Sequence, residues 1–442
     1  MIGGGILFSP PQVAANVPHP WLFLGAWLAG GALAFAGAMA YAELATLRPR
    51  SGGEYVYLDA AFGRLAAFLT GWTSFVAGFS GAIAASASVF AFYLARFVPA
   101  AASDAPILVV PIPWIPLAIS RQSIAALALI ALMCWIHVRG VGPGRIVGNV
   151  LAALKVSALV VFIALGLTIG SGSTSNLQSI GGNVSTGTWL LALVPVMFTY
   201  AGWNAASYVA EEICDPGRNV PLALASGTAA VVAIYLLLNA LYLYVFPIGS
   251  LAAVKGSVLD VIADRLLGAR AGDVMGVVSI VSLAASVSAM TIAGPRVYYA
   301  MARDGVFLAP AARVHARYRT PAVAIVSQSI WSGLLVLSGG ASALIRYTGF
   351  AVVLFSGVAV AAMFVLRRRE PDAPRPFKAL GYPLAPAVFV VASLLIVANA
   401  IYSDPRPSGA GVLIIAAGVP VYLMFSRRSR TGNLSPTARA SA

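Results

Sequence analysis

Apolar stretches of helical length recur along the whole chain, separated by short segments rich in Arg, Gly and Pro. A helix needs about 20 apolar residues to cross a hydrocarbon layer of about 30 Å. The pattern therefore predicts membrane-spanning helices throughout. The twelve predicted segments are Ile2–Asn16 (short), Trp21–Leu47, Leu65–Val98, Ser123–Val138, Ile146–Ile169, Trp189–Glu212, Ala223–Phe246, Val274–Ala302, Pro321–Leu337, Leu344–Leu366, Pro383–Tyr402 and Gly411–Phe425.

Composition agrees with this pattern. Hydrophobic residues make up 60% of the chain and charged residues 10%, whereas a soluble domain carries about 25% charged residues. A membrane β-barrel would show segments of about 10 residues with alternating polarity, and the sequence has none. We therefore expect an all-α polytopic membrane protein.

The net charge of +14 suggests a nucleic-acid partner, but the placement of the basic residues argues against one. If every segment crosses and the loop Arg48–Arg64 is cytoplasmic, most Arg and Lys residues fall on the cytoplasmic side. This is the positive-inside asymmetry of membrane proteins. Both termini are then cytoplasmic. The preference for Arg over Lys, with abundant Ala, Gly and Val, indicates a GC-rich bacterial genome, and so a bacterial cytoplasmic (inner) membrane.

One transmembrane domain, residues 1–425, is expected, followed by a basic cytoplasmic tail, residues 426–442, without stable structure. Cys134 and Cys214 give no sign of a disulfide framework. His19, His137 and His315 lack the spacing of metal ligands. We expect no metal site and no cofactor. The sequence leaves the oligomeric state open.

Two of the predicted helices contain residues that break a helix. Gly3, Gly4 and Gly5 adjoin each other in the first segment, and each costs a helix about 1 kcal/mol relative to alanine. The sixth segment carries a polar and aromatic patch at Val196–Tyr208, with Gly202 and Asn204 inside it. Taken alone, the first feature is explained by a small-residue packing face or by a floppy terminus. The second is explained by ordinary aromatic packing with Asn204 bonded to a neighbouring helix. Interruptions at corresponding positions of two halves point instead to a midplane binding site of a transporter.

Such breaks expose backbone N–H groups at the start of one half-helix and C=O groups at the end of the other. An α-amino acid carries a carboxylate and an ammonium on one carbon, so it meets both sets at once. The sequence therefore predicts backbone recognition of an amino-acid head group.

At these residues the sequence resembles the amino acid–polyamine–organocation superfamily, close to its L-type amino-acid transporter branch. Four segments carry the resemblance, in the family's order. Ile2–Pro10 resembles the first-helix motif I-G-S-G-I-F-x-x-P; Tyr41–Leu44 with Pro49–Leu58 resembles the end of helix 2 and its loop; Phe198–Asn204 with Glu211, Glu212 and Pro221 resembles F-A-Y-x-G-W-N…E-E…P; and Arg296–Gly305 resembles the end of helix 8.

The resemblance implies alternating access by a 5+5 inverted repeat, residues 1–170 and 187–366, followed by helices 11 and 12 in residues 383–425. It implies a substrate carboxylate at Gly3, Gly4, Gly5 and Ile6, although Gly4 stands where the family often has Ser. It implies that Phe198, Thr199, Tyr200 and Ala201 supply carbonyls to the ammonium, with Phe198 as a gate. Trp203 and Asn204 would shape the pocket. Tyr235 would steady the unwound part of helix 1.

Lys155 is the only charged residue between Arg145 and Glu211. It lies nine residues past Ile146, or about 13 Å into the bilayer at 1.5 Å per residue. Ionisable residues at such depth are functional by default, with a structural ion pair as the alternative. By the family resemblance, Lys155 replaces the sodium ion that ties helix 1 to helix 8, near Ser286 or Ser288. Transport is then sodium-independent, and proton coupling through the same ammonium is a variant.

Other polar residues receive smaller roles. Glu43 is expected to cap or pair locally near the cytoplasm, in a supporting or gating role. The stretch Ser51–Glu54 reads as a turn and a helix start. Arg367, Arg368 and Arg369 are expected to face anionic lipid.

The expected function is transport of amino acids, neutral ones in particular, by exchange or proton coupling. A membrane enzyme is disfavoured because no catalytic constellation appears at membrane depth. An amine or polyamine carrier and a non-transporting amino-acid sensor are the alternatives. From Met1 to Asn16 is too short for a full crossing. Either the chain begins further upstream, or the cytoplasmic half of helix 1 is missing.

Overall fold

The computed structural model describes residues 1–111, 117–178, 182–268, 270–339, 341–403 and 405–432. The longer helices are α1 (Gly5–Asn16), α2 (Pro20–Leu47), α3 (Glu54–Phe62), α4 (Arg64–Thr73), α5 (Phe79–Leu94), α6 (Arg121–Val138), α7 (Val141–Thr168), α8 (Thr186–Tyr200), α10 (Pro216–Val245), α12 (Val258–Leu267), α13 (Ala271–Arg303), α14 (Ala322–Leu337), α15 (Ala341–Arg369), α16 (Leu384–Ser403) and α17 (Pro405–Gly432).

The short elements connect these helices. They are the π-helical turn η1 (Ser74–Gly78), the 3-10 turns η2 (Pro99–Ala101), η3 (Thr174–Leu177), η4 (Ala210–Glu212) and η5 (Ala309–Ala312), the helices α9 (Ala205–Tyr208) and α11 (Ile248–Ala252), and the strands β1 (Pro106–Val110) and β2 (Leu117–Ser120). The two strands pair antiparallel, with Val109 opposite Ala118.

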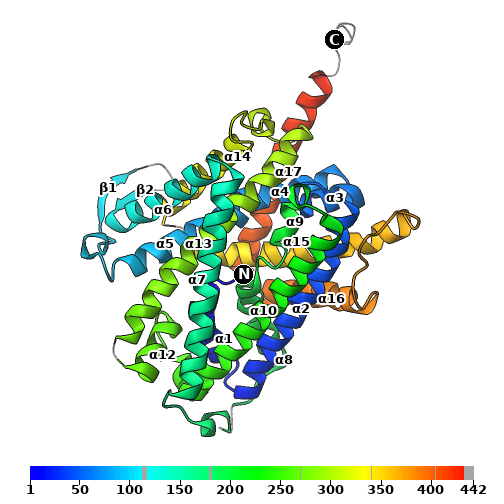
Figure 1. Cartoon of the computed structure of the whole chain (residues 1–442). Helices are drawn as coiled ribbons and strands as arrows, with labels where there is room; N and C mark the ends of the chain where they lie inside the picture. The colour runs from blue at the N-terminus through cyan, green and yellow to red at the C-terminus, as the bar shows by residue number, and fades with distance from the viewer. Residues whose placement is uncertain (112–116, 179–181, 269, 340, 404, 433–442) are drawn as a thin grey trace.

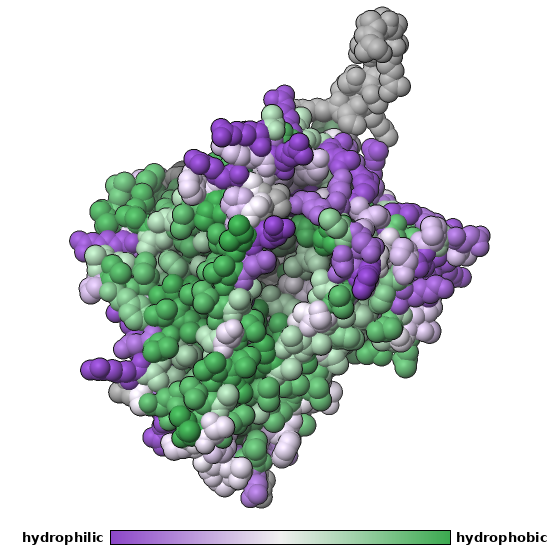
Figure 2. Space-filling view, in the orientation of Figure 1, coloured by the Kyte–Doolittle hydropathy of each residue, from purple (hydrophilic) through white to green (hydrophobic). Residues whose placement is uncertain are grey.

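The prediction of a helical, polytopic membrane protein is confirmed. Within the described residues, nine helices are long and apolar enough to cross a bilayer, and α8 and α14 are shorter apolar helices. Helix α7 exposes Ile146, Val150, Leu154 and Val161, each between 51% and 62%. An exposed apolar face on a helix of this length is the expected lipid-facing surface of a membrane span. Figure 2 shows this hydrophobic surface, with polar side chains gathered toward the end from which α17 projects.

Several elements differ from the predicted segments. The segment Leu65–Val98 is α4, η1 and α5 in sequence, with the π-helical turn in the middle. Helix α10 begins at Pro216, before the predicted Ala223, because a proline at the first helical position starts a helix in polar sequence as well. The hairpin β1–β2 and the surface helix α12 were not predicted. Helix α17 continues to Gly432, past the predicted end at Phe425, and residues 433–442 of the tail lie outside the described residues.

Four long-range contacts organise the bundle. Helix α1 packs against α8, α2 against α10, α5 against α13, and α6 against α14. Figure 1 shows the amino terminus lying among these helices in the interior of the molecule. The first residues of the chain therefore contribute to the core, in which Ile2 is 4% and Ile6 1% exposed.

Candidate functional site

The two predicted helix breaks lie side by side. Regular helix begins at Gly5, so Met1–Gly4 is irregular. The sixth segment breaks after Tyr200 and resumes at Ala205. Gly202 has φ +96°, which a non-glycine residue rarely adopts. A β-carbon on Gly202 would lie 3.1 Å from the backbone nitrogen of Met1, so the two unwound stretches are in direct contact.

Close approach of α1 and α8 depends on Gly5. A β-carbon there would lie 2.8 Å from the Cα and from the Oγ1 of Thr199. The Thr199 hydroxyl donates to the Pro195 carbonyl at 2.7 Å, and the Ser9 hydroxyl lies 2.9 Å from it. Ser9 was missed in the sequence, because a serine on an apolar helix gives no periodic signal. Gly5, which has no side chain, therefore lies against a threonine hydroxyl that is held by two hydrogen bonds.

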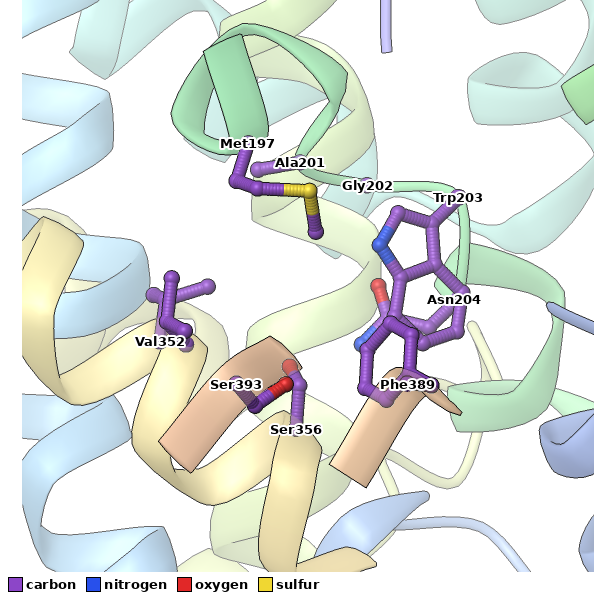
Figure 3. Close-up of a pocket in the computed structure, with 10 residues that line it drawn as sticks. Met197, Ala201, Gly202, Trp203, Asn204, Val352, Ser356, Phe389 and Ser393 are labelled. Carbon is purple, nitrogen blue, oxygen red and sulfur yellow. The ribbon is translucent and has the colours of Figure 1, made fainter. Parts of the chain in front are cut away.

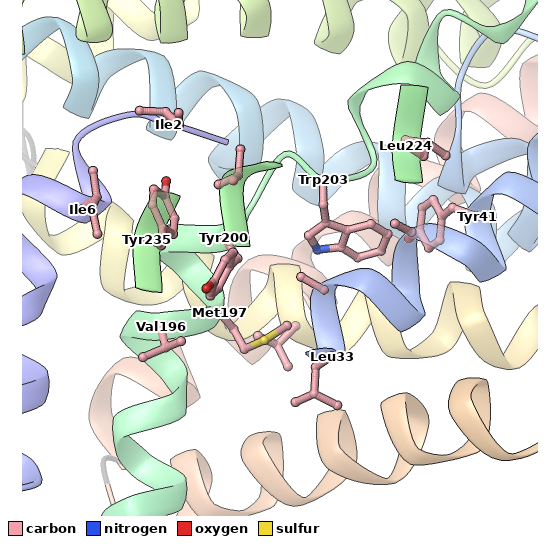
Figure 4. Close-up of a cluster of buried hydrophobic side chains, with 14 of the residues drawn as sticks. Ile2, Ile6, Leu33, Tyr41, Val196, Met197, Tyr200, Trp203, Leu224 and Tyr235 are labelled. Atoms are coloured by element: carbon pink, nitrogen blue, oxygen red, sulfur yellow. The ribbon is translucent and has the colours of Figure 1, made fainter. Parts of the chain in front are cut away.

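Tyr235 of α10 spans both breaks. Its hydroxyl lies 3.0 Å from the Met1 carbonyl oxygen and 3.2 Å from the Thr199 carbonyl oxygen. The Tyr200 and Tyr235 rings lie 5.0 Å apart between centroids, and Trp27 of α2 lies against both. Figure 4 shows the Tyr200 and Tyr235 rings below the unwound stretch that carries Ile2. The aromatic cluster therefore packs beneath the non-helical backbone of the two breaks and helps to hold it in place.

Some of the residues expected to offer free carbonyls have partners within the chain. The Phe198 carbonyl accepts from the Ala201 N–H at 3.0 Å, and the Thr199 carbonyl accepts from Tyr235. The Tyr200 hydroxyl donates to the Trp27 carbonyl at 3.1 Å. A carbonyl oxygen has a second lone pair, so a further donor can still bind at Phe198 and Thr199. Gly3 and Gly4 lie against α13, where a β-carbon would face Ser286 and Leu283 respectively.

Lys155 reaches the first break from α7. Its Nζ donates to the Ile2 carbonyl oxygen at 2.9 Å. The Ser286 hydroxyl of α13 lies 3.3 Å from the same oxygen and 3.0 Å from the Ser282 carbonyl oxygen. Ser288 is elsewhere: its hydroxyl lies 2.9 Å from the His137 Nε2. Two residues along a helix correspond to about 200° of rotation, so only one of the two serines faces Lys155.

Trp203 and Asn204 lie within the second break, next to the start of α9. The Trp203 ring lies 4.7 Å from Tyr41 and 5.8 Å from Phe389 between centroids. The Asn204 amide donates to the Glu54 carboxylate at 2.9 Å. Figure 3 shows a small cavity beside these residues, between the break and helices α15 and α16. Glu54 was not predicted here, since nothing local to the Gly-Gly turn shows which helix it will meet.

Glu43 does not pair locally, so that expectation is wrong. Arg367 donates to both its oxygens, at 2.8 and 2.6 Å, and the Ala379 N–H donates at 2.7 Å. Glu43 is 1% exposed. The reason is that the ends of α2 and α15 lie together. Arg367 therefore holds Glu43, and Arg369 donates to the Ala61 carbonyl at 2.8 Å.

A set of ion pairs joins the segment after the second break to α13. Glu212 accepts from Arg296 at 2.8 and 3.0 Å, and Glu211 accepts from Arg303 at 3.3 Å. Glu211 also accepts the Ser51 N–H at 2.9 Å. These hydrogen bonds from Ser51 and Arg303 hold the pKa of Glu211 below its usual value against partial burial. No group of three His, Cys, Asp or Glu side chains suited to a metal ion occurs among the described residues.

Interrupted helices that meet inside a polytopic helical membrane protein are typical of secondary transporters. A sequence model of the amino acid permease family matches residues 1–425. The chain therefore belongs to that family, which lies within the amino acid–polyamine–organocation superfamily, and the resemblance drawn from its motifs is confirmed.

Characterised relatives match over nearly the whole chain. The human large neutral amino acids transporter small subunit 2 is 30% identical, over 96% of this chain and 77% of that protein. The human cystine/glutamate transporter is 31% identical, over 96% of this chain and 82% of its own length. The serine/threonine exchanger SteT of Bacillus subtilis (strain 168) is 25% identical, over 97% of this chain and 94% of its own length. All three are transporters or exchangers by name.

Proposed function

We propose that this chain is a secondary transporter that moves neutral amino acids across a bacterial cytoplasmic membrane by alternating access, without sodium. The observation that carries the proposal is the contact between the two helix breaks, with the Lys155 ammonium on the Ile2 carbonyl. The names of the relatives support amino acids as the substrate class. Because two of these relatives are named exchangers or neutral amino-acid transporters, exchange of neutral amino acids is the favoured mode.

The contacts within the bundle support a 5+5 inverted repeat followed by two further helices, twelve crossings in one domain over residues 1–425. In terms of predicted crossings, α1 contacts α8, which joins the first to the sixth, and α2 contacts α10, which joins the second to the seventh. Likewise α5 contacts α13, which joins the third to the eighth, and α6 contacts α14, which joins the fourth to the ninth. Each pair thus consists of equivalent members of the two halves. Helices related by an axis in the membrane plane meet in this way, and the substrate site lies at their interface.

Recognition at the breaks is proposed to rest on backbone. Amides near Gly3, Gly4 and Gly5 meet the carboxylate, and carbonyls at Phe198 and Thr199 meet the ammonium. Oppositely charged ends of half-helices favour both contacts. The cavity at the second break has no Asp or Glu among its lining residues, and the Glu54 carboxylate accepts from Asn204. A site without a free carboxylate favours zwitterions over amines and polyamines.

Lys155 is proposed to do the work of a bound sodium ion. Its ammonium on α7 donates to the Ile2 oxygen at 2.9 Å, and the Ser286 hydroxyl on α13 lies 3.3 Å from that oxygen. A cation held at this oxygen ties the unwound stretch to α7 and α13 permanently. A dissociable sodium ion is then unnecessary. Proton coupling is the variant in which Lys155 exchanges a proton during the cycle.

The test is radiolabelled amino-acid flux into proteoliposomes that contain the full chain. Neutral amino acids are expected to exchange against internal amino acid, at the same rate in sodium and in choline buffers. Lys155→Ala should lower the rate at least 10-fold, whereas Lys255→Ala, in an exposed loop, should keep the wild-type rate.

Each alternative has its own outcome in this assay. A non-transporting sensor binds amino acid but shows no flux, and an amine carrier moves amines instead. A rate that depends on sodium, or an unchanged rate in Lys155→Ala, would contradict the role given to Lys155 while leaving amino-acid transport intact.

A further inference from the structure

Glu54 begins α3 beside the second helix break. Its Oε1 accepts from the Tyr41 hydroxyl of α2 at 2.6 Å and from the Asn204 amide at 2.9 Å. The Tyr208 hydroxyl of α9 interacts with the same carboxylate, and Asn204 donates to that hydroxyl at 3.0 Å. One carboxylate thus joins three elements, α2, α3 and the α9 segment.

Glu54 differs from the other glutamates of the chain in its partners. Glu43, Glu211, Glu212 and Glu370 each pair with an arginine. No Arg or Lys nitrogen within the described ranges lies within 4.0 Å of Glu54. Glu54 is half-buried. An ionised carboxylate with little water around it and without a cation is costly, and protonation removes that cost.

The other titratable groups around Glu54 do not supply a charge. Phenols face it: Tyr41 from α2, Tyr57 from α3 itself and Tyr208 from α9. The charged groups on the elements packed against α3 have other partners. These are Asp304 of the α13 end with Tyr55 and Arg50, Arg369 of α15 with the Ala61 carbonyl, and Arg64 of α4 near Tyr55 and Asp59.

Burial raises the pKa of the Glu54 carboxyl above its ordinary value, against the opposing effect of the hydrogen bonds from Tyr41, Tyr208 and Asn204. The direction agrees with the geometry, since several donors and no cation surround the group. In this arrangement the carboxyl therefore holds a proton to higher pH than it would in water.

A cavity gives water a place beside this network. It is lined by Asn204, Ser356 of α15 and Ser393 of α16, together with apolar side chains, and has a volume of about 20 Å³. That is room for one water molecule. The Ser356 hydroxyl also interacts with the Tyr41 hydroxyl. Figure 3 shows Ser356, Ser393 and Asn204 around the hollow. Hydroxyls thus connect the cavity to the Glu54 carboxylate.

We propose that Glu54 is a proton-binding site of this transporter, loaded when α2, α3 and the α9 segment lie together and emptied to water when they separate. The proposal rests on the proposed alternating access, in which this side faces the cytoplasm and the separated form opens to it. A proton bound at Glu54 favours the joined form. The fraction of joined transporters therefore rises as the cytoplasmic pH falls.

The experiment measures amino-acid exchange by the full chain in proteoliposomes at a series of internal pH values. Wild type is expected to change its rate around a single midpoint. Glu54→Gln keeps the acceptor for Tyr41 and Asn204 but cannot ionise, so this change should vanish. Tyr41→Phe removes a donor that favours the ionised form, so the midpoint should move up by on the order of one pH unit. Asp372→Asn, on the exposed loop after α15, should match wild type.

A second readout is independent of transport. In pH-difference infrared spectra of the purified protein, the carbonyl band of a protonated carboxyl should be present in wild type and reduced in Glu54→Gln. The same midpoint in Glu54→Gln and wild type, or unchanged infrared bands, would overturn the proposal. Absence of flux in every variant and in wild type would count against the proposed function instead, and the infrared titration would still decide for or against Glu54. If Glu54→Gln fails to fold, the shift in Tyr41→Phe carries the test.

Discussion

Gly5 is a residue at which α1 lies closely against α8. A β-carbon there would meet the Thr199 backbone at 2.8 Å, a distance that neither helix can accept without moving. Thr199 is also held by hydrogen bonds to Ser9 and Pro195. A β-carbon at Gly5 would therefore push the two unwound stretches out of alignment.

We expect Gly5→Ala to lower amino-acid exchange at least 10-fold and to destabilise the fold by about 1–3 kcal/mol, as overpacking does in well-packed interiors. Flux in proteoliposomes and thermal unfolding in detergent check both effects. Gly227→Ala is the matched control, because a β-carbon at Gly227 of α10 meets nothing within 4 Å. Equal flux in the two variants would show that the close approach at Gly5 is dispensable.

At the scale of elements, α12 is an amphipathic helix that no membrane-length pattern predicts. Ser257 accepts the Asp260 N–H at 3.4 Å at its start, and Asp260 lies 3.5 Å from Arg96 at the end of the α5 region. Arg96 has a closer partner in Asp273, at 2.6 Å. Arg96 therefore forms a closer ion pair with Asp273 than with Asp260.

Burial raises the pKa of Asp260 from 3.8 to about 6. A carboxyl with a raised pKa binds its proton more tightly in the folded chain than in the unfolded one. Asp260 therefore lowers stability as the pH rises from about 4 to about 6, with the full loss above that range. Asp260→Asn should raise the unfolding temperature at pH 7. The corresponding gain in the free energy of unfolding is at most about 3 kcal/mol.

Thermal unfolding at a series of pH values checks this, and the two proteins should unfold at the same temperature near pH 4. Asp264→Asn on the same helix is the control. The Asp264 carboxylate accepts the Gly272 N–H at 2.7 Å, so its replacement should bring no gain. Lower stability of Asp260→Asn at neutral pH would mean that the Arg96 pair outweighs the cost of burial.

The boundaries of elements show what a hydrophobic pattern can predict. Helix α16 was expected at Pro383–Tyr402 and runs over Leu384–Ser403, because its apolar length coincides with its helical length. Helix α10 begins in polar sequence at Pro216, and α3 and α12 are only 9 and 10 residues long, so apolar length alone places none of these starts. Local capping residues such as Ser257 carry that information.

At the scale of the whole molecule, the proposed topology assigns a side to each loop. Cys214 is a free, exposed cysteine between η4 and α10, on the side to which both termini are assigned. We expect an impermeant maleimide to label Cys214 in inverted membrane vesicles and not in intact cells. Cys134→Ser leaves Cys214 as the sole thiol, because the chain has 2 cysteines. Labelling from outside intact cells would reverse the assigned orientation.

The sequence by itself determined that the chain is a helical membrane protein of the amino acid permease family, and where its first and sixth segments break. These properties depend on residues close to one another in the chain: apolar length, adjacent glycines, and motifs in a fixed order. The break at Gly202 depends on local backbone geometry. Its φ of +96° is a conformation that glycine adopts readily and other residues rarely adopt.

Only the tertiary structure decided which side chains meet. Glu43 pairs with Arg367 and Glu54 with Tyr41 and Asn204, and Ser286 rather than Ser288 reaches the Ile2 carbonyl beside Lys155. These partners are far apart in the sequence. Their contact depends on how each helix is rotated and how deeply it sits against its neighbours, and packing of the whole bundle sets both.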